Sequence, residues 1–222
     1  MHLIQKDFGK WLNNFTEEQL KMVMDNQVKL SYNKGEIISK QGGFASHIIF
    51  LSEGLIKIYK EHNDKNLILK LVKPGEFIGL SSLFSKSTFD YSAACIDDSK
   101  VYSINIETLK ALVKSNPDFA EKIIWLMNQN TSQYFERIMS LTQKQLHGRI
   151  ADAILHLSRE IFESTSFNML LTRRDLAEFC GMSTESAIRI LKEFHNDKIV
   201  NIDGKMMEVI SFPLLERLSE VG

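Results

Sequence analysis

The pattern of hydrophobic residues changes between residues 106 and 116, and this change constrains the fold more than any other feature of the chain. From about residue 30 to 106 there are short β-like runs, such as 47–51, 55–59 and 67–72, separated by glycines or polar turns. Many short strands with glycines between them are typical of a β-sandwich or β-roll. Beyond residue 116 the apolar residues recur at helical spacing. The order predicts an α+β protein whose N-terminal part is a jelly roll, a double-stranded β-helix.

Local signals support the roll and a short helix before it. Thr16 and Gln19 form a capping-box pattern, which predicts a helix from there to about residue 27. The segments 52–54 and 61–66 are predicted to join neighbouring strands as hairpins. Five glycines are predicted to lie at corners that need a positive φ or a close backbone approach: Gly35, Gly42, Gly54, Gly75 and Gly79.

A long helix is predicted after Asn116, because a capping side chain before Pro117 is a favoured helix start. Along it, residues recur at alternating steps of three and four, the spacing of a coiled-coil seam. The seam could pack on the roll of its own chain, or on the same helix of a second subunit; we favour the second arrangement, an isologous homodimer. The seam residues are Ile124, Met127, Thr131, Tyr134, Ile138 and Leu141.

The motif around Gly148 interrupts the helical pattern, and we expect a hinge there. These features divide the chain into a β-roll domain at 1–115, a long helix and hinge at 116–147, and a C-terminal domain at 148–222.

The segment 170–210 predicts a winged helix-turn-helix. Thr172 and Asp175 form a second capping box, the turn follows at 180–182, and Ser183 caps another helix. In that helix one face is apolar and predicted to be buried: Ala187, Ile190, Leu191 and Phe194. Two β-like runs joined by Asp203 and Gly204 come next, and Asp-Gly is a strong hairpin signal.

The opposite face of the second helix is predicted to enter the major groove of double-stranded DNA. Glu185 can accept a hydrogen bond from cytosine N4, Arg189 can donate two to guanine, and Ile188 can contact a thymine methyl group. An alternative is a surface ion pair between Glu185 and Arg189, worth about 0.3–0.5 kcal/mol; the following hairpin argues for the DNA interpretation. The residues predicted to contact phosphates are Arg173, Arg174, Thr184, Lys192 and Lys205.

Composition limits the alternatives. The 222 residues hold 27 Lys and Arg against 28 Asp and Glu, so an argument for DNA must be local. Between residues 170 and 192 four basic residues face three acidic ones, a net charge of only +1, so affinity should depend on dimerisation and salt. We find no targeting signal and no membrane span, and expect a cytoplasmic protein. Cys95 and Cys180 lie in apolar settings that favour packed thiols over a disulfide or a redox sensor.

These motifs, in this order, resemble the Crp/Fnr family, the cyclic-AMP receptor protein and its relatives, over nearly the whole chain. The likeness rests on the glycine-cornered roll, the segment 74–79, the seam helix, the segment 148–151 and the winged helix at 171–204. It implies a cyclic-nucleotide-binding-like roll, a transcription regulator that contacts RNA polymerase, and a palindromic operator with TGA-like half-sites contacted by Glu185 and Arg189.

The resemblance also implies an effector pocket in the roll, but not for cyclic AMP. Family members that bind it use Gly-Glu-Leu for the ribose and an Arg followed by Ser or Thr for the phosphate. Here Leu80 stands in the first motif, and no Arg lies between Gly79 and Ala93, where a buried phosphate would meet Asp90 without a counter-charge. The effector is therefore unidentified, and its expected pocket residues are Gly79, Leu80, Ser81, Tyr91, Ser92 and Tyr134.

No cofactor is predicted. The iron–sulfur branch of the family needs an N-terminal cysteine cluster, whereas the first cysteine here is Cys95. Haem would need a histidine ligand, for which His2, His47 and His62 are the candidates in or near the roll. No phosphate loop, nucleophile elbow or metalloprotease motif indicates an enzyme. The remaining alternative is a ligand-binding or protein-interaction module that does not contact DNA bases.

Overall fold

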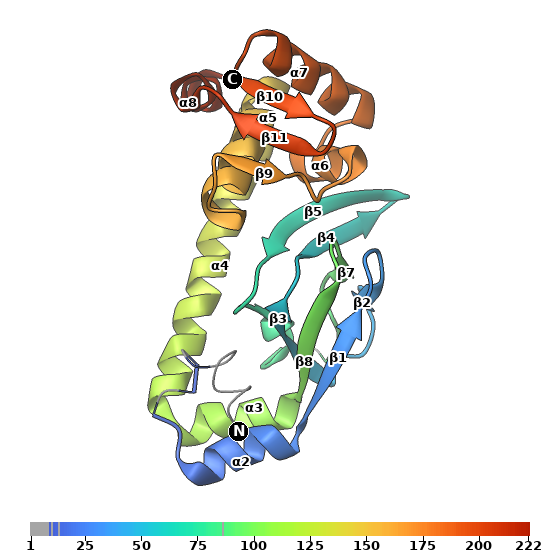
Figure 1. The fold of residues 1–222 in the computed structure, drawn as a ribbon. Helices are drawn as coiled ribbons and strands as arrows, with labels where there is room; N and C mark the ends of the chain where they lie inside the picture. Colours follow the sequence, from blue (N-terminus) through green and yellow to red (C-terminus); the bar gives the residue numbers. More distant parts are fainter. Residues whose placement is uncertain (1–8, 10, 13, 86) are drawn as a thin grey trace. The chain divides into compact units, whose positions relative to one another are not determined.

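The computed structural model describes residues 9, 11, 12, 14–85 and 87–222, and in it the chain divides into two compact units. The first unit comprises residues 1–61 and 71–133, and the second comprises 62–70 and 134–222. Figure 1 shows strands gathered in the roll, and helices with a small sheet in the C-terminal part. The predicted α+β fold is confirmed.

The roll is built from two four-stranded sheets (Figure 1). One sheet has the order β1 (Gln27–Tyr32), β8 (Ser99–Asn105), β3 (His47–Glu53) and β6 (Phe77–Ile78). The other has the order β2 (Ile37–Ser39), β7 (Ser92–Cys95), β4 (Ile56–His62) and β5 (Lys65–Val72). Neighbours such as β1 and β8, or β3 and β8, pair antiparallel. The predicted runs at 47–51, 55–59 and 67–72 each form a strand of this roll.

All five predicted corner glycines have a positive φ. Gly54 shows the need most clearly, because its φ is +101° and a Cβ there would lie 2.3 Å from Ser99 Oγ. The hairpin between β4 and β5 turns on Asn63 and Asp64, which both have a positive φ, as a tight two-residue hairpin requires.

Three helices pack on one face of the first sheet. They are α2 (Glu17–Asp25), α3 (Ile106–Ser115) and the first half of α4 (Pro117–Gln143). The predicted capping box of Thr16 and Gln19 begins α2. The helix α3 was not predicted, since its residues continue directly from β8. The buried cluster beneath the helices includes Ile48, Phe50, Tyr102, Ile104, Leu109, Leu112, Phe119 and Ile123.

The long helix α4 carries two apolar stripes. It begins as predicted, with Asn116 Oδ1 accepting a hydrogen bond from the Phe119 N–H at 3.0 Å. Phe119, Ile123 and Leu126 are buried in the cluster beneath it. The predicted seam is a separate stripe whose large side chains Ile124 and Ile138 are 61% and 54% exposed. Packing on the roll therefore uses other residues than the seam. Four seam residues, Ile124, Met127, Thr131 and Ile138, are exposed, whereas Tyr134 and Leu141 are partly buried.

The break after α4 lies before the predicted position. The helix ends at Gln143, and α5 (Leu146–His156) begins three residues later. Gly148 is a buried residue inside α5, so the prediction that it interrupts the helix is wrong. Its lack of a side chain serves close packing instead: a Cβ there would lie 3.0 Å from the backbone of Gly222.

The second unit holds the winged helix. After α5 come a π-helical turn (Leu157–Ile161), β9 (Ser166–Asn168), α6 (Arg173–Cys180), α7 (Thr184–Asn196), β10 (Val200–Asp203), β11 (Met206–Val209) and α8 (Phe212–Val221). The predicted hairpin of β10 and β11 is confirmed, and β9 adds a third strand beside β11. Within the described residues, no helix combines the length and apolar character needed to cross a membrane.

Candidate nucleic-acid interface

The interface is built on α7, which is fixed by its cap and its buried face. Ser183 Oγ accepts a hydrogen bond from the Ser186 N–H at 3.2 Å, which satisfies one of the free N–H groups of the first turn. The four side chains predicted to face the core are all buried, which confirms the predicted orientation of the helix: Ala187, Ile190, Leu191 and Phe194.

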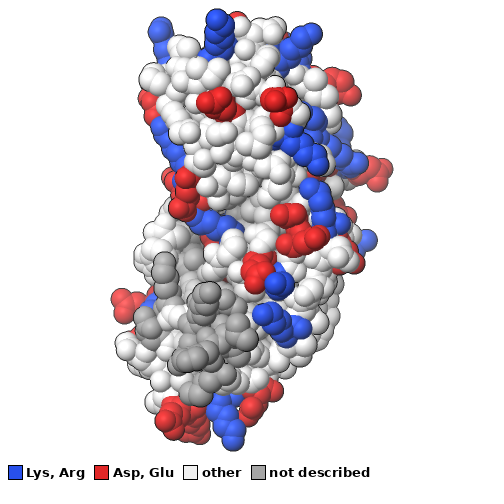
Figure 2. Space-filling model, viewed as in Figure 1, with Lys and Arg blue, Asp and Glu red and all other residues white. Residues whose placement is uncertain are grey.

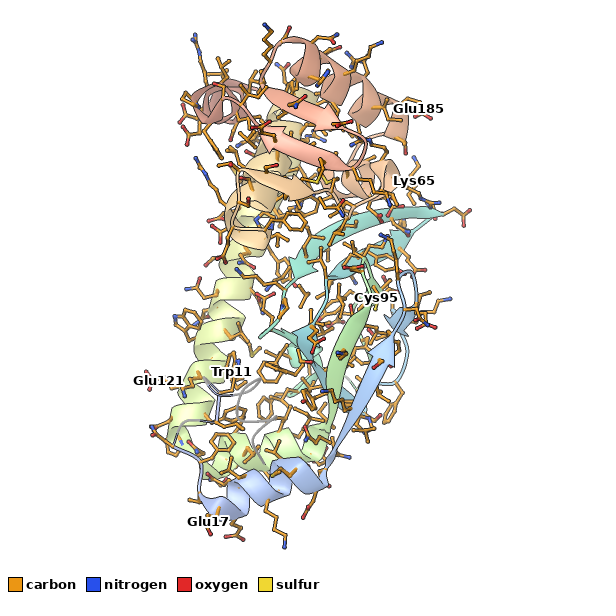
Figure 3. The ribbon with its side chains drawn as sticks, in the orientation of Figure 1. Trp11, Glu17, Lys65, Cys95, Glu121 and Glu185 are labelled. Atoms are coloured by element: carbon orange, nitrogen blue, oxygen red, sulfur yellow. The ribbon has the colours of Figure 1, made fainter. Side chains whose placement is uncertain are left out.

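The opposite face of α7 is open to solvent. Glu185, Arg189 and Lys192 are exposed, and Ile188 is 48% exposed although it is a large apolar residue. Figure 3 labels Glu185 on this helix. Thr184, predicted on the same face, is only partly exposed because it lies in the first turn beside the cap. One helical face thus presents a carboxylate, an aliphatic side chain and a guanidinium within about one turn.

The helix α6 and the turn hold α7 in place. Thr172 and Asp175 form the predicted capping box at the start of α6. The turn ends α6 at Gly181, whose φ of +60° a residue with a side chain rarely adopts. Leu176, Ala177 and Phe179 are buried beneath the pair. This is the arrangement of a helix-turn-helix in which the second helix is presented outward.

Arg189 makes an ion pair that differs from the expected alternative. Its Nη1 donates to Glu193 Oε1 at 2.8 Å, and not to Glu185. The other oxygen of Glu193 lies 2.7 Å from His147 Nε2. The hydrogen bond to His147, and then that to Arg189, lower the pKa of Glu193. The Arg189 side chain is 58% exposed, so this pair is weak and can be exchanged for a DNA base at little cost.

Sequence reasoning missed Glu193 and His147. The spacing of four between Arg189 and Glu193 was a signal for the first of these contacts. The contact between His147 and Glu193 joins residues 46 positions apart, so no local sequence pattern predicts it.

Glu185 has the protonation state needed to accept hydrogen bonds. Its pKa is lowered by its own backbone N–H and by the Ser183 hydroxyl, both at the start of α7. The carboxylate therefore stays ionised at neutral pH, and an ionised carboxylate only accepts hydrogen bonds. Such a group complements the amino group of cytosine.

The residues predicted to contact phosphates differ in how exposed they are and in whether another side chain already binds them. Lys192 is exposed on α7, and Lys205 is exposed at the tip of the wing beside Gly204. Arg173 is partly buried. Arg174 Nε donates to Glu178 Oε1 at 2.8 Å, and this contact raises the pKa of the Arg174 guanidinium. In Figure 2 acidic and basic side chains are interspersed on the face shown, in line with the nearly balanced charge of the chain.

Five of the residues predicted for the effector pocket lie in the first unit, and among them Gly79, Tyr91 and Ser92 are hydrogen-bonded to groups of that unit. The Gly79 N–H donates to the Tyr91 hydroxyl at 2.9 Å. Ser92 Oγ accepts from the Gln41 N–H at 2.9 Å and donates to Glu61 Oε1 at 2.6 Å. Leu80 is buried and Ser81 is partly buried in the short 3₁₀ turn Leu80–Ser82. Tyr134, predicted for the same pocket, belongs to the second unit.

These residues do not fit a cyclic nucleotide. A phosphate placed beside Ser92 would meet the Glu61 carboxylate, and the Gly79 N–H that could bind an anion is already bound to Tyr91. Burial raises the pKa of the Tyr91 hydroxyl, so it stays protonated and neutral, and a neutral hydroxyl supplies no positive charge to balance a phosphate.

The cysteines do not fit an iron–sulfur cluster either. Such clusters are held by four Cys thiolates, and the chain has only Cys95 and Cys180, both buried and in different units. Cys95 lies among the strands of the roll (Figure 3). Among the described residues, no group of three or more His, Cys, Asp or Glu side chains could hold a metal ion. His47 and His62 belong to no such group, and His2 lies outside the described residues.

Known protein families match both the β-roll and the winged helix. Residues 29–116 match the Cyclic nucleotide-binding domain, and residues 148–218 match the Crp-like helix-turn-helix domain. The chain belongs to the Crp/Fnr family of transcription regulators. Relatives that the chain matches are named as regulatory proteins and transcriptional regulators, in agreement with the predicted regulator.

Individual Crp/Fnr relatives are distant in sequence but similar in length and fold. The HTH-type transcriptional regulator ArcR of Staphylococcus aureus (strain Newman) is 28% identical over 180 residues, 78% of this chain and 76% of that protein. The fumarate and nitrate reduction regulatory protein of Vibrio cholerae is 24% identical over 217 residues, 95% of this chain and 85% of that one. The structure of FixK2 from Bradyrhizobium japonicum superposes with a TM-score of 0.81 at 21% identity, over 88% of this chain and 98% of FixK2.

Proposed function

We propose that this Crp/Fnr protein is a homodimer that binds palindromic DNA, with the outer face of α7 in the major groove of each half-site. The observation that carries the proposal is the presentation of Glu185, Ile188 and Arg189 on a capped helix whose other face is buried. An ionised carboxylate and a guanidinium one turn apart complement a cytosine and a guanine on neighbouring base pairs. This complementarity supports half-sites with a TGA-like core.

Contacts to phosphates position the helix on the duplex. Lys192 beside the base-contacting residues and Lys205 on the wing are exposed and can bind phosphates directly. Arg174 would first leave Glu178, whose carboxylate is largely buried, so it is a weaker candidate than the two lysines. Arg173 and Thr184, both partly exposed, are the remaining candidates. The small excess of positive charge makes two half-sites necessary for useful affinity.

The exposed seam of α4 supports the dimer. Large apolar side chains on a helix seldom remain in solvent at two or more successive turns, and pairing with a second α4 would cover them. The twofold axis would place the two α7 helices in successive major grooves, roughly 34 Å apart. A signal received by the roll would act by shifting the paired helices, and contact with RNA polymerase would convert binding into regulation. A cytoplasmic location is part of this proposal, because the DNA is there.

The test is a fluorescence anisotropy titration with two duplexes of equal length and base composition. One carries two TGA-containing half-sites about one helical turn apart, and the other has the same bases scrambled. We expect the palindrome to bind at least tenfold more tightly at about 0.15 M salt, with an affinity that falls steeply as salt rises. Equal affinity for both duplexes would favour a ligand-binding or protein-interaction module instead.

A further inference from the structure

The roll contains a cavity made by none of the residues predicted for the effector pocket. Its volume is about 160 Å³. It is formed by three neighbouring strands of the first sheet, by a residue of β2 in the other sheet, and by Phe44, Ser46 and Phe89 in connecting segments. The lining residues are Leu30, Tyr32, Ile38, Phe44, Ser46, His47, Ile49, Phe89, Val101 and Ser103.

Strand alternation places this cavity inside the roll. Ile48, Phe50 and Tyr102 point to the sheet face covered by the helices, where they join the buried cluster. Ile49 and Ser103, which are paired in register, therefore point to the opposite face. That face meets Ile38 from the second sheet.

The cavity has a closed floor and an open rim. Val101 is fully buried and Ile49 nearly so, whereas Phe44 is 74% exposed. A ligand could therefore enter past Phe44 without opening the core of the roll.

The chemistry of the lining selects an uncharged ligand. None of the ten residues is Asp, Glu, Lys or Arg, so a carboxylate or phosphate would lose its hydration without gaining a counter-charge. Ser46 Oγ lies 2.8 Å from His47 Nδ1. The Tyr32 and Ser103 side chains each bring a hydroxyl group to the lining. These two hydroxyls can bind one polar group of a ligand.

The size of the cavity limits the ligand to about one ring. An apolar cavity of about 150 Å³ is large enough for benzene and too small for a nucleotide. Three of the lining side chains, Tyr32, Phe44 and Phe89, are aromatic and favour a ring as neighbour. Haem would not fit, although His47 is in the lining.

We infer that this cavity binds an uncharged single-ring aromatic compound with one hydroxyl group, and that such a compound is the effector class of this regulator. The claim that the compound binds is independent of the proposed function. The claim that it is the effector rests on the proposed function. The ring would lie between Ile38, Ile49 and Phe89, and its hydroxyl would bond to Ser103 or Tyr32.

Binding is tested directly on the full chain with phenol, which is neutral at pH 7. Methyl NMR signals of Leu30, Ile38, Ile49 and Val101 are followed as phenol is added. We expect saturable shifts at these methyl groups, with a dissociation constant on the order of 1 mM or below. Benzoate, a ring of the same size with a charge, should bind at least tenfold more weakly. Absence of saturable shifts with phenol, or equal binding of benzoate, would overturn the inference.

Variants locate the site. Ser103→Leu fills the cavity and should weaken phenol binding at least tenfold. Phe44→Ala removes an exposed wall, which leaves the core intact, and should weaken it about threefold or more. Phe84→Ala is the matched control, because Phe84 is 60% exposed and lies outside the lining; its binding should equal that of the unchanged protein. Unchanged binding in Phe44→Ala, together with a folded Ser103→Leu that still binds, would overturn the inference.

The two proposals fail in different ways. Anisotropy titrations with the palindromic duplex are repeated with and without saturating phenol, and we expect the DNA affinity to change at least threefold. If the duplex binds specifically but phenol does not bind, the effector inference fails and the proposed function stands. If phenol binds in the cavity and no duplex is preferred, the proposed function fails and the ligand site stands. If both bind without affecting each other, the effector half of the inference is wrong.

Discussion

The outer face of α7 and the segment 79–92 of the roll both carry polar groups at positions where the family resemblance implies a ligand. The two regions differ in whether these polar groups are exposed or are hydrogen-bonded within the protein. On α7, Glu185 and Lys192 are exposed, and Arg189 is held only by an exposed ion pair. In the roll, Tyr91 and Ser92 are bound to groups of the same unit. A surface prepared for a ligand keeps its polar groups exposed or weakly paired. A segment whose Tyr91 and Ser92 hydroxyls are already bound offers fewer free groups to a ligand.

The largest effect is expected from a change in the dimer seam, because dimerisation determines whether two α7 helices bind the DNA together. Ile138→Asp places two charges in the apolar contact of the proposed dimer, so it should yield a monomer. DNA affinity should fall at least about 100-fold, because the two half-sites no longer bind as one unit. Analytical ultracentrifugation and anisotropy titration measure the two changes together.

Gln129→Asp is the matched control for this variant. Gln129 lies nine residues before Ile138, half a turn out of phase on the same helix, and is exposed. The control should remain a dimer with unchanged DNA affinity. A monomeric Ile138→Asp that still binds the palindrome at full affinity would contradict the dimer proposal.

A change in the roll should open the segment that is now closed. Tyr91→Arg combined with Glu61→Gln supplies a guanidinium, removes the opposing carboxylate and frees the Gly79 N–H. We expect the affinity for cyclic AMP, measured by calorimetry, to rise at least tenfold over that of the unchanged chain. Tyr91→Phe, which adds no charge, should not produce this gain. Tight cyclic AMP binding by the unchanged protein would show that the segment is not closed.

A smaller effect is expected where Arg189 meets its protein partner. Glu193→Gln removes the charge that competes with DNA for Arg189, so affinity for the palindrome should rise about two- to fivefold. Glu208→Gln, on an exposed wing residue, makes the same change in net charge without touching Arg189. Equal gains in both variants would mean that general electrostatics, and not release of Arg189, is responsible.

The cysteines belong to neither surface, and changes at them should have the smallest effect on DNA binding. Burial raises the pKa of Cys180 to about 12 from an ordinary value of 9.0, and it also raises the pKa of Cys95. Both thiols therefore stay protonated at pH 8, and alkylation by iodoacetamide, followed by mass spectrometry, should be at least 100-fold slower than in urea.

The same shift has a consequence for stability. The folded state keeps the Cys180 proton that the unfolded state loses above about pH 9, so the contribution of this thiol is complete below pH 9 and declines between about pH 9 and 12. Rapid modification of the native protein at pH 8 would contradict the buried, protonated state of these cysteines.

The sequence predicted the winged helix well because its signals are local. Capping residues such as Ser183, an apolar face repeated every three or four residues and the Asp203-Gly204 turn all act within a few positions of one another. The strand β9, with only three residues and no alternation, carried no such signal, and α3 followed β8 without a break. The helix break was misplaced because a glycine can serve close packing as well as a bend.

The features that were missed depend on contacts between distant residues. The bond from His147 to Glu193 spans 46 positions. The cavity in the roll needs the register of β1, β8 and β3, which brings Leu30, Ser103 and Ile49 to one face. No pattern within one segment could indicate either of them, because side chains from separate strands combine only after the sheet has formed.

The most direct test of the account compares base discrimination by the unchanged chain and by Arg189→Ala. Duplexes are used in which the guanine of each TGA-like half-site is kept or replaced. The unchanged chain should prefer the guanine duplex by roughly 5- to 150-fold, and Arg189→Ala should lose this preference while keeping its weak binding to unrelated DNA. Lys192→Ala should instead weaken binding to every duplex alike. If Arg189→Ala keeps the full preference for guanine, the proposed contact between α7 and the base pairs is wrong.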